Sequence, residues 1–192
     1  MEPPIATDVT LAAEHPVRLD LLGAAWDWTT DRLGPVQADD LGRATPCADF
    51  DLGRLLDHLA ESVERFVTVL GGTVPTTAGT TPAERFARLR TAHLSAWADA
   101  DPDGACELPF GLVPARLAAD LNLAELVLHG WDIGRATGER ADVPDELAIP
   151  VLAIGEQLLT DEIREGAFAP AVDVAADAAA SDRMAAWYGR RI

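Results

Sequence analysis

One segment of the chain, residues 121–133, is apolar or glycine except for a single line of polar side chains. Asn122, Glu125, His129 and Asp132 follow one another at spacings of three, four and three, which places them on one face of a helix. Because the other faces are apolar, we expect the helix and its polar line to be buried. Burying a carboxylate and an imidazole without partners costs several kcal/mol. The segment therefore predicts a central helix whose Glu125 and His129 are compensated by a partner, most simply a divalent metal.

Helical patterns account for most of the remaining chain. Apolar residues recur at helical spacing, and residues 81–84 form a capping box with proline at the first helical position. The predicted helices cover residues 15–33, 52–70, 82–100, 114–137, 144–165 and 181–188, and the segment 106–113 is expected to be extended. This pattern predicts an all-α fold in one domain over residues 1–192. Its bundle core is expected at about 15–138, followed by an extension of additional helices over 139–192.

Charge and hydropathy argue against several classes of partner. The net charge is −17, which disfavours binding to nucleic acid and to anionic membrane surfaces. No apolar run approaches the roughly 20 residues that span a bilayer. The first residues lack the basic and apolar regions of a secretory signal, so a cytoplasmic protein is expected. The two cysteines, Cys47 and Cys106, are too few for a disulfide framework, and each is expected to act as a small buried apolar residue.

A metal site on the central helix needs at least one further ligand, and the chain has four histidines. We interpret His15 as a surface or capping residue, and His93 has no polar residues arranged around it in sequence. His58 differs, because it falls just beyond the edge of the apolar face of the helix 52–70, from where a side chain reaches a neighbouring helix. His58, Glu125 and His129 together would leave at least one position open, as in catalytic rather than structural sites.

The same residues have simpler interpretations. A single histidine at a helix boundary, such as His58, is more often a hydrogen-bonded histidine than a metal ligand. Glu125 and His129 stand four residues apart and also fit a buried hydrogen bond or an ion pair. Asn122 and Asp132 either orient a ligand or cap neighbouring loops. Spacing alone leaves these alternatives open.

Two blocks of the sequence resemble a known family. Residues 45–59, TPCADFDLGRLLDHL, and residues 124–138, AELVLHGWDIGRATG, are similar to the two blocks of the mycothiol-dependent maleylpyruvate isomerase N-terminal family. This family belongs to the DinB-like superfamily of metal-binding four-helix bundles, and the resemblance extends over roughly 17–138. It implies a DinB-like four-helix bundle with metal ligands at His58, Glu125 and His129.

The resemblance has two departures. Phe50 stands where the first block usually has tryptophan, in a packing role. The full-length isomerases carry a second domain after the bundle, whereas only 54 residues follow Gly138. The tail resembles a shorter actinobacterial branch whose members are described as metal-binding proteins, so we expect the chain to lack the isomerase C-terminal domain.

The resemblance and the open metal position together predict an enzyme. We expect it to bind a low-molecular-weight thiol, mycothiol or a similar compound, as the thiolate and to use it for isomerisation of, or transfer to, a small electrophile. Zinc is the expected metal, and nickel, iron or cobalt suit the same ligands. Asp132 and Arg135 are the predicted catalytic residues, with Asn122 as a further residue that orients a ligand. The alternatives are a metal-dependent hydrolase, and a non-catalytic metal-binding or sensory bundle. In each case we expect a monomer or a homodimer.

Overall fold

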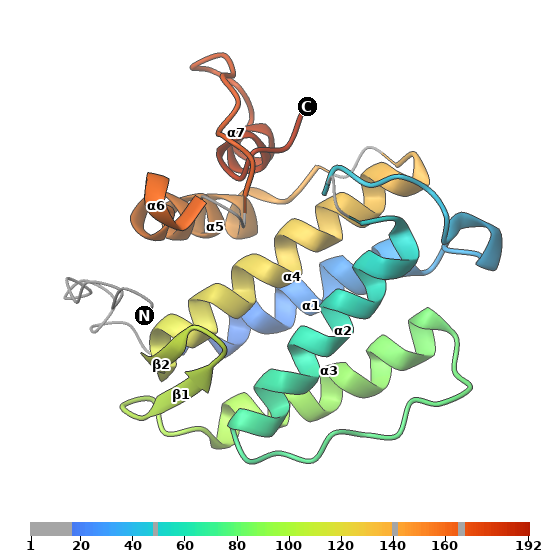
Figure 1. Ribbon diagram of the computed structural model, residues 1–192, viewed down its shortest axis with the longest axis vertical. Coiled ribbons are helices and arrows are strands. Elements are labelled where there is room, and N and C mark those ends of the chain that lie inside the picture. Colours follow the sequence, from blue (N-terminus) through green and yellow to red (C-terminus); the bar gives the residue numbers. More distant parts are fainter. Residues whose placement is uncertain (1–16, 48–49, 140–141, 165–167) are drawn as a thin grey trace.

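The computed structural model describes residues 17–47, 50–139, 142–164 and 168–192 (Figure 1). Four long helices form a bundle: α1 (Leu19–Leu33), α2 (Leu52–Val69), α3 (Pro82–Asp99) and α4 (Ala115–Thr137). Helix α4 packs against α1 and α2, and α3 completes the ring by contacting the same two helices. This arrangement confirms the predicted all-α, DinB-like four-helix bundle.

Two smaller units complete the described part of the chain. Strands β1 (Ala105–Leu108) and β2 (Gly111–Pro114) pair antiparallel between α3 and α4, so the segment expected to be extended forms a hairpin. Helix α5 (Asp145–Leu158) packs on α4 and on α7 (Ala180–Trp187). Helices α5 and α7 both lie on the α4 side of the bundle in Figure 1. No helix of the described residues is long and apolar enough to cross a membrane.

The predicted helix over 144–165 is too long. Helix α5 ends at Leu158, and a separate short helix α6 (Asp161–Arg164) follows. The Thr160 hydroxyl accepts a hydrogen bond from the backbone of Ile163 at 3.3 Å, which starts a new turn. A threonine side chain can thus offer the backbone an alternative to continuing the helix. Of the predicted helix over 15–33, residues 15 and 16 lie outside the described residues, and α1 begins at Leu19.

Local sequence explains where the bundle helices begin and end. The Asp51 carboxylate accepts a hydrogen bond from the backbone of Arg54 at the start of α2. Thr81 and Glu84 form the predicted capping box at the start of α3. Helix α4 ends at Gly138, whose φ of 83° is the left-handed conformation that glycine adopts without steric cost. The start of α2 and the end of α4, the two helices that carry the candidate site, are thus set by local sequence.

Close packing brings α1 and α4 together at Gly130. An added Cβ at this glycine would lie 2.5 Å from the ring of Trp28 and 2.7 Å from the hydroxyl of Thr29. That hydroxyl, which is fully buried, donates a hydrogen bond to the carbonyl of Leu126 at 2.9 Å. The glycine therefore lets α1 lie directly against the middle of α4, the helix with the polar line.

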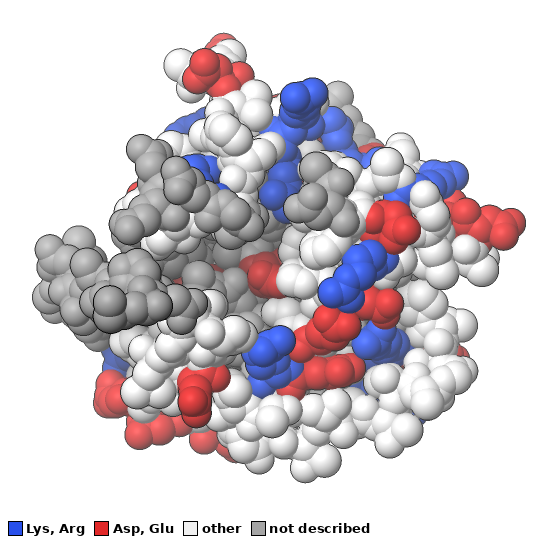
Figure 2. Space-filling model, viewed as in Figure 1, with Lys and Arg blue, Asp and Glu red and all other residues white. Residues whose placement is uncertain are grey.

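The outer face of the bundle is strongly charged. Figure 2 shows basic and acidic side chains interspersed over it. On α2 and α3, Arg85 contacts Asp57 at 2.8 Å and Glu64 at 3.4 Å, and Arg54 contacts Glu61 at 3.2 Å. Such partly exposed pairs stabilise a fold only slightly. The outer face of α2 and α3 thus carries charges of both signs, several of them in pairs.

Candidate metal centre

Three side chains from two packed helices converge at one point. Helix α2 supplies His58, and α4 supplies Glu125 and His129. Glu125 Oε1 lies 3.0 Å from His58 Nε2 and 3.8 Å from His129 Nε2. One potential ligand atom from each residue lies within 4.8 Å of the other two. Ligand atoms around a tetrahedral zinc ion are roughly 3.4 Å apart, so small side-chain movements would bring this triad into ligating distance.

The triad is open on one side. The side chains of His58 and Glu125 are 34% and 29% exposed, whereas that of His129 is only 8% exposed. The rings of His58 and His129 are perpendicular, with centroids 5.2 Å apart, and the ring of Phe50 lies 5.0 Å from that of His58. A ligand that enters beside His58 and Glu125 would therefore meet these two solvent-accessible side chains and the ring of Phe50.

Asp132 orients His129, the buried member of the candidate triad. Its Oδ2 lies 3.0 Å from His129 Nδ1, one turn along α4. Because an ionised carboxylate only accepts hydrogen bonds, Nδ1 carries a hydrogen, and Nε2, on the side of Glu125, is the nitrogen that can bind a metal when the ring is neutral. This carboxylate–histidine pair is the arrangement that fixes the tautomer of metal-binding histidines. The donor set and its orientation thus fit a divalent metal.

Arg190 completes this chain of contacts, and the sequence analysis missed it. Its Nε and Nη2 donate to the two oxygens of Asp132 at 3.1 and 2.8 Å, and its Nη1 donates to the carbonyl of Tyr188 at 3.1 Å. Asp132 is fully buried and Arg190 is 5% exposed. A buried carboxylate calls for a cation, but the chain has fifteen arginines and nothing in the local sequence distinguishes Arg190.

The electrostatics keep the acidic groups of the centre ionised. Burial by itself would raise the pKa of Asp132, but hydrogen bonds from His129 and Arg190 lower it below its ordinary value. Burial is likewise outweighed at Glu125, whose pKa is lowered by the hydrogen bond from His58 and by the charge of His129. The hydrogen bond to Glu125 in turn raises the pKa of His58. Both carboxylates are therefore negatively charged, and that of Glu125 can serve as a metal ligand.

Asn122 and His93 lie elsewhere, in a second buried polar cluster. The expectation that nothing polar surrounds His93 is wrong. Trp26 Nε1 donates to His93 Nδ1 at 2.9 Å, and because an indole can only donate, the ring hydrogen must be on Nε2. This nitrogen donates to Asn122 Oδ1, which also accepts from Trp97 Nε1 at 3.0 Å. The polar line of α4 is thus divided, with Asn122 serving this cluster rather than the triad.

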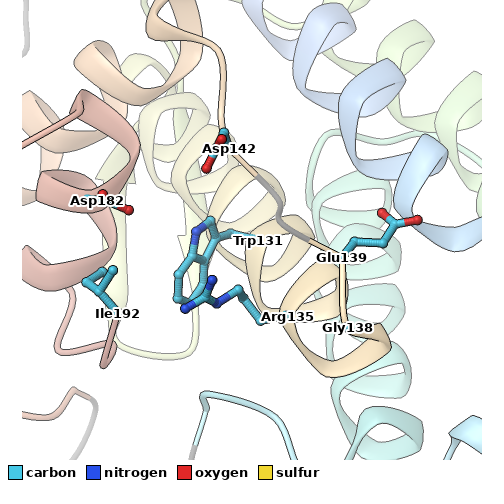
Figure 3. Close-up of a pocket in the computed structure, with 7 residues that line it drawn as sticks. All are labelled: Trp131, Arg135, Gly138, Glu139, Asp142, Asp182 and Ile192. Carbon is cyan, nitrogen blue, oxygen red and sulfur yellow. The ribbon is translucent and has the colours of Figure 1, made fainter.

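Arg135, the second predicted catalytic residue, lies in a different environment. It is exposed, and its guanidinium stacks over the ring of Trp131 at 5.0 Å (Figure 3). It lines a pocket together with Trp131, Gly138, Glu139, Asp142, Asp182 and Ile192. None of the three candidate ligands lines this pocket, so the structure does not bring Arg135 to the triad. Its catalytic role stays a prediction.

The remaining sequence-derived residues have simple placements. Cys106 is buried on β1, where burial raises the pKa of its thiol. Cys47 is half-buried just before α2, beside the turn in which the Thr45 hydroxyl donates to the carbonyls of Cys47 and Phe50. His15 lies outside the described residues.

Comparison with known proteins identifies a family whose characteristic region includes the candidate triad. The family model of the mycothiol maleylpyruvate isomerase N-terminal domain matches residues 22–134. Two uncharacterized proteins of Mycobacterium tuberculosis, from strains CDC 1551 / Oshkosh and ATCC 25618 / H37Rv, are each 27% identical to the chain over 164 residues. These alignments cover 83% of this chain and 90% of each relative. No solved structure matches significantly. The family match includes the triad and Asp132 but ends before Arg190.

Proposed function

Because this chain belongs to the mycothiol maleylpyruvate isomerase N-terminal domain family, we propose that it is a thiol-using enzyme dependent on a divalent metal. In this proposal His58, Glu125 and His129 hold the metal, zinc in the first instance, and mycothiol or a similar small thiol occupies the open side. The observation that carries the proposal is the convergence of two imidazoles and one carboxylate beside a solvent-accessible face. The family suggests metal binding and a relation to mycothiol; the catalytic role is our inference.

The charges of the donor set favour an anionic sulfur ligand. Two neutral imidazoles and one carboxylate leave a divalent ion with a net charge of about +1, which attracts a thiolate more strongly than a neutral thiol. When bound, the metal supplies the positive charge that keeps the sulfur deprotonated near neutral pH. His58 and Glu125 lie on the exposed side, where the thiol would enter. Asp132 holds His129 in the orientation that presents Nε2.

The chemistry that follows is addition of sulfur to an electrophilic carbon. The sulfur lone pair forms the S–C bond, and the π electrons of the electrophile move onto its activating group. If the S–C bond breaks again after rotation about the adjacent bond, the thiol is returned and the product is an isomer. If the adduct instead takes up the proton that the thiol released, the product is a thiol conjugate. Both outcomes need the same site, so the electrophile decides between isomerase and transferase.

Two alternatives are less well supported by the geometry. A hydrolase would need a general base near the metal, and the candidate predicted from the sequence, Asp132, has its oxygens occupied by His129 and Arg190. A purely structural or sensory site would be closed by a fourth protein ligand. Among the described residues, no fourth His, Cys, Asp or Glu joins the triad. We therefore favour the thiol-using enzyme.

Metal content tests the ligand assignment. Replacing Glu125 by Gln removes the charged donor while keeping its shape, and we expect the bound zinc, measured by elemental analysis after dialysis, to fall strongly. Glu156→Gln is the matched control, because Glu156 is an exposed glutamate on α5, a helix that contributes no residue to the triad. Unchanged zinc stoichiometry in the Glu125 variant would remove Glu125 as a ligand.

Thiol titration tests the function. Zinc-loaded and cobalt-substituted protein are titrated with mycothiol and with a simple thiol as control. We expect mycothiol to bind more tightly, to raise the melting temperature, and to produce sulfur-to-cobalt charge-transfer absorption. If neither thiol changes the cobalt spectrum or the melting temperature, the protein does not use a thiol at this centre.

A further inference from the structure

The C-terminal segment, residues 180–192, reaches the candidate metal centre through Arg190. We propose that Arg190 is a positioning residue of this centre, and that metal binding and docking of the C-terminal segment stabilise each other. The inference rests on the metal binding proposed above and does not depend on the identity of the thiol or electrophile.

A continuous chain of contacts connects Arg190 to the candidate ligand. The guanidinium engages both oxygens of Asp132, at 3.1 Å through Nε and 2.8 Å through Nη2. Asp132 Oδ2 in turn lies 3.0 Å from His129 Nδ1. A two-point contact fixes the plane of the carboxylate as well as its position, which a lysine would not do. The orientation of the His129 ring, and hence the direction of its Nε2 lone pair, is thus set from the C-terminal segment.

The backbone after α7 is built to turn Arg190 inwards. Gly189 has a φ of 78°, and a side chain there would collide with the backbone of Ala169. The turn is closed by a hydrogen bond of 2.9 Å from the Arg190 amide to the carbonyl of Ala185. As a result Arg190 is buried, whereas its neighbour Arg191 is exposed.

Other contacts hold the segment on α5 and on residues that precede α7, without involving the triad. The hydroxyl of Tyr188 donates to the carbonyl of Val151 on α5 at 3.0 Å, and the amide of Val172 donates to the carbonyl of Ala186 at 2.9 Å. Arg190 is the contact through which this docked unit reaches α4 at Asp132. Loss of its guanidinium would therefore leave the segment anchored on α5 but disconnected from the metal centre.

The coupling follows from burial and from linkage. Without Arg190, Asp132 is a fully buried carboxylate with one partner in place of two, so its side chain rearranges and no longer holds His129. Removal of residues that hydrogen-bond to a metal ligand, without touching the metal themselves, weakens metal binding by about 10- to 100-fold. Because coupling between two sites is reciprocal, the metal must strengthen docking of the segment by the same factor that docking strengthens metal binding.

The first measurement is zinc affinity of the full chain by chelator competition. We expect Arg190→Met to weaken zinc binding by about 10- to 100-fold, and Arg190→Lys, which keeps the charge but not the two-point contact, to weaken it less. Arg191→Met, a matched exposed neighbour, should equal the wild type. Equal affinities for the wild type and the Arg190→Met variant would overturn the inference.

The second measurement begins with the wild type, so its main result does not depend on whether a variant folds. Hydrogen exchange of the amides in 180–192 is compared in the zinc-free and zinc-loaded wild type. We expect zinc to slow this exchange in the wild type, and to slow it less in Arg190→Lys, with a change in the cobalt absorption spectrum of that variant. Exchange that is insensitive to zinc in the wild type would overturn the coupling.

These results separate the inference from the proposed function. Coupling of zinc to the segment without any response to mycothiol would remove the thiol function and support the role of Arg190. A response to mycothiol with unchanged zinc affinity in Arg190→Met would support the thiol function and remove the role of Arg190. A wild-type chain that binds no divalent metal would overturn both.

Discussion

The buried cluster around His93 predicts a specific loss of stability in acid. Burial lowers the pKa of His93 to about 4 from its ordinary value of 6.5. Between these values the unfolded chain binds a proton at this residue and the native protein does not. The free energy of unfolding therefore falls as the pH decreases from about 6.5 towards 4, and above about pH 7 the titration of this residue no longer makes it change with pH.

The magnitude follows from the size of the shift. One pKa unit corresponds to about 1.36 kcal/mol, so between about pH 7.5 and about pH 5 the contribution of His93 amounts to roughly 2 kcal/mol. Replacing His93 by Gln removes the titrating group but keeps an amide that can donate and accept hydrogen bonds. We expect the variant to be less stable than the wild type at neutral pH, with the difference shrinking by about 2 kcal/mol at about pH 5.

Urea denaturation in the presence of a chelator, at several pH values, measures this difference. His58→Gln is the matched control with the opposite sign. The hydrogen bond to Glu125 raises the pKa of His58 in the folded protein, so its stabilisation is full below about pH 6.5 and is lost as the pH rises through the folded pKa. The deficit of this variant should therefore grow as the pH falls. A stability difference between the wild type and His93→Gln that is constant with pH would refute the reasoning, as would an NMR titration of His93 near pH 6.5.

Two further substitutions test the packing and capping of the bundle. Gly130→Ala forces a Cβ against Trp28 and Thr29 and should destabilise the protein by about 1–3 kcal/mol in urea denaturation, whereas Gly23→Ala, where a Cβ meets nothing within 4 Å, should not destabilise it. Thr81→Ala removes the side-chain acceptor at the start of α3 and should cost about 1 kcal/mol in the same assay, and an unchanged denaturation midpoint would contradict the cap.

Features that depend on neighbouring residues in the chain were predictable. The capping box before α3 and the apolar spacing of α2 placed both helices to within a residue or two, because caps and periodicity act within one or two turns. Spacing also placed Glu125 and His129 on one face of α4. The end of α5 was predicted wrongly, because an apolar run continues past Leu158 while the backbone turns at Thr160.

What the sequence by itself determined, then, is an all-α bundle whose central helix has a buried polar line, with two candidate ligands on it. His58 was selected by its place at the edge of the apolar face of its helix and by the family resemblance. The partners of that line came only from the tertiary structure. His93 and Trp97 meet Asn122, and Arg190 meets Asp132 from 58 residues further along the chain. Helical periodicity specifies which way a side chain faces, but which residue lies opposite depends on how distant segments pack.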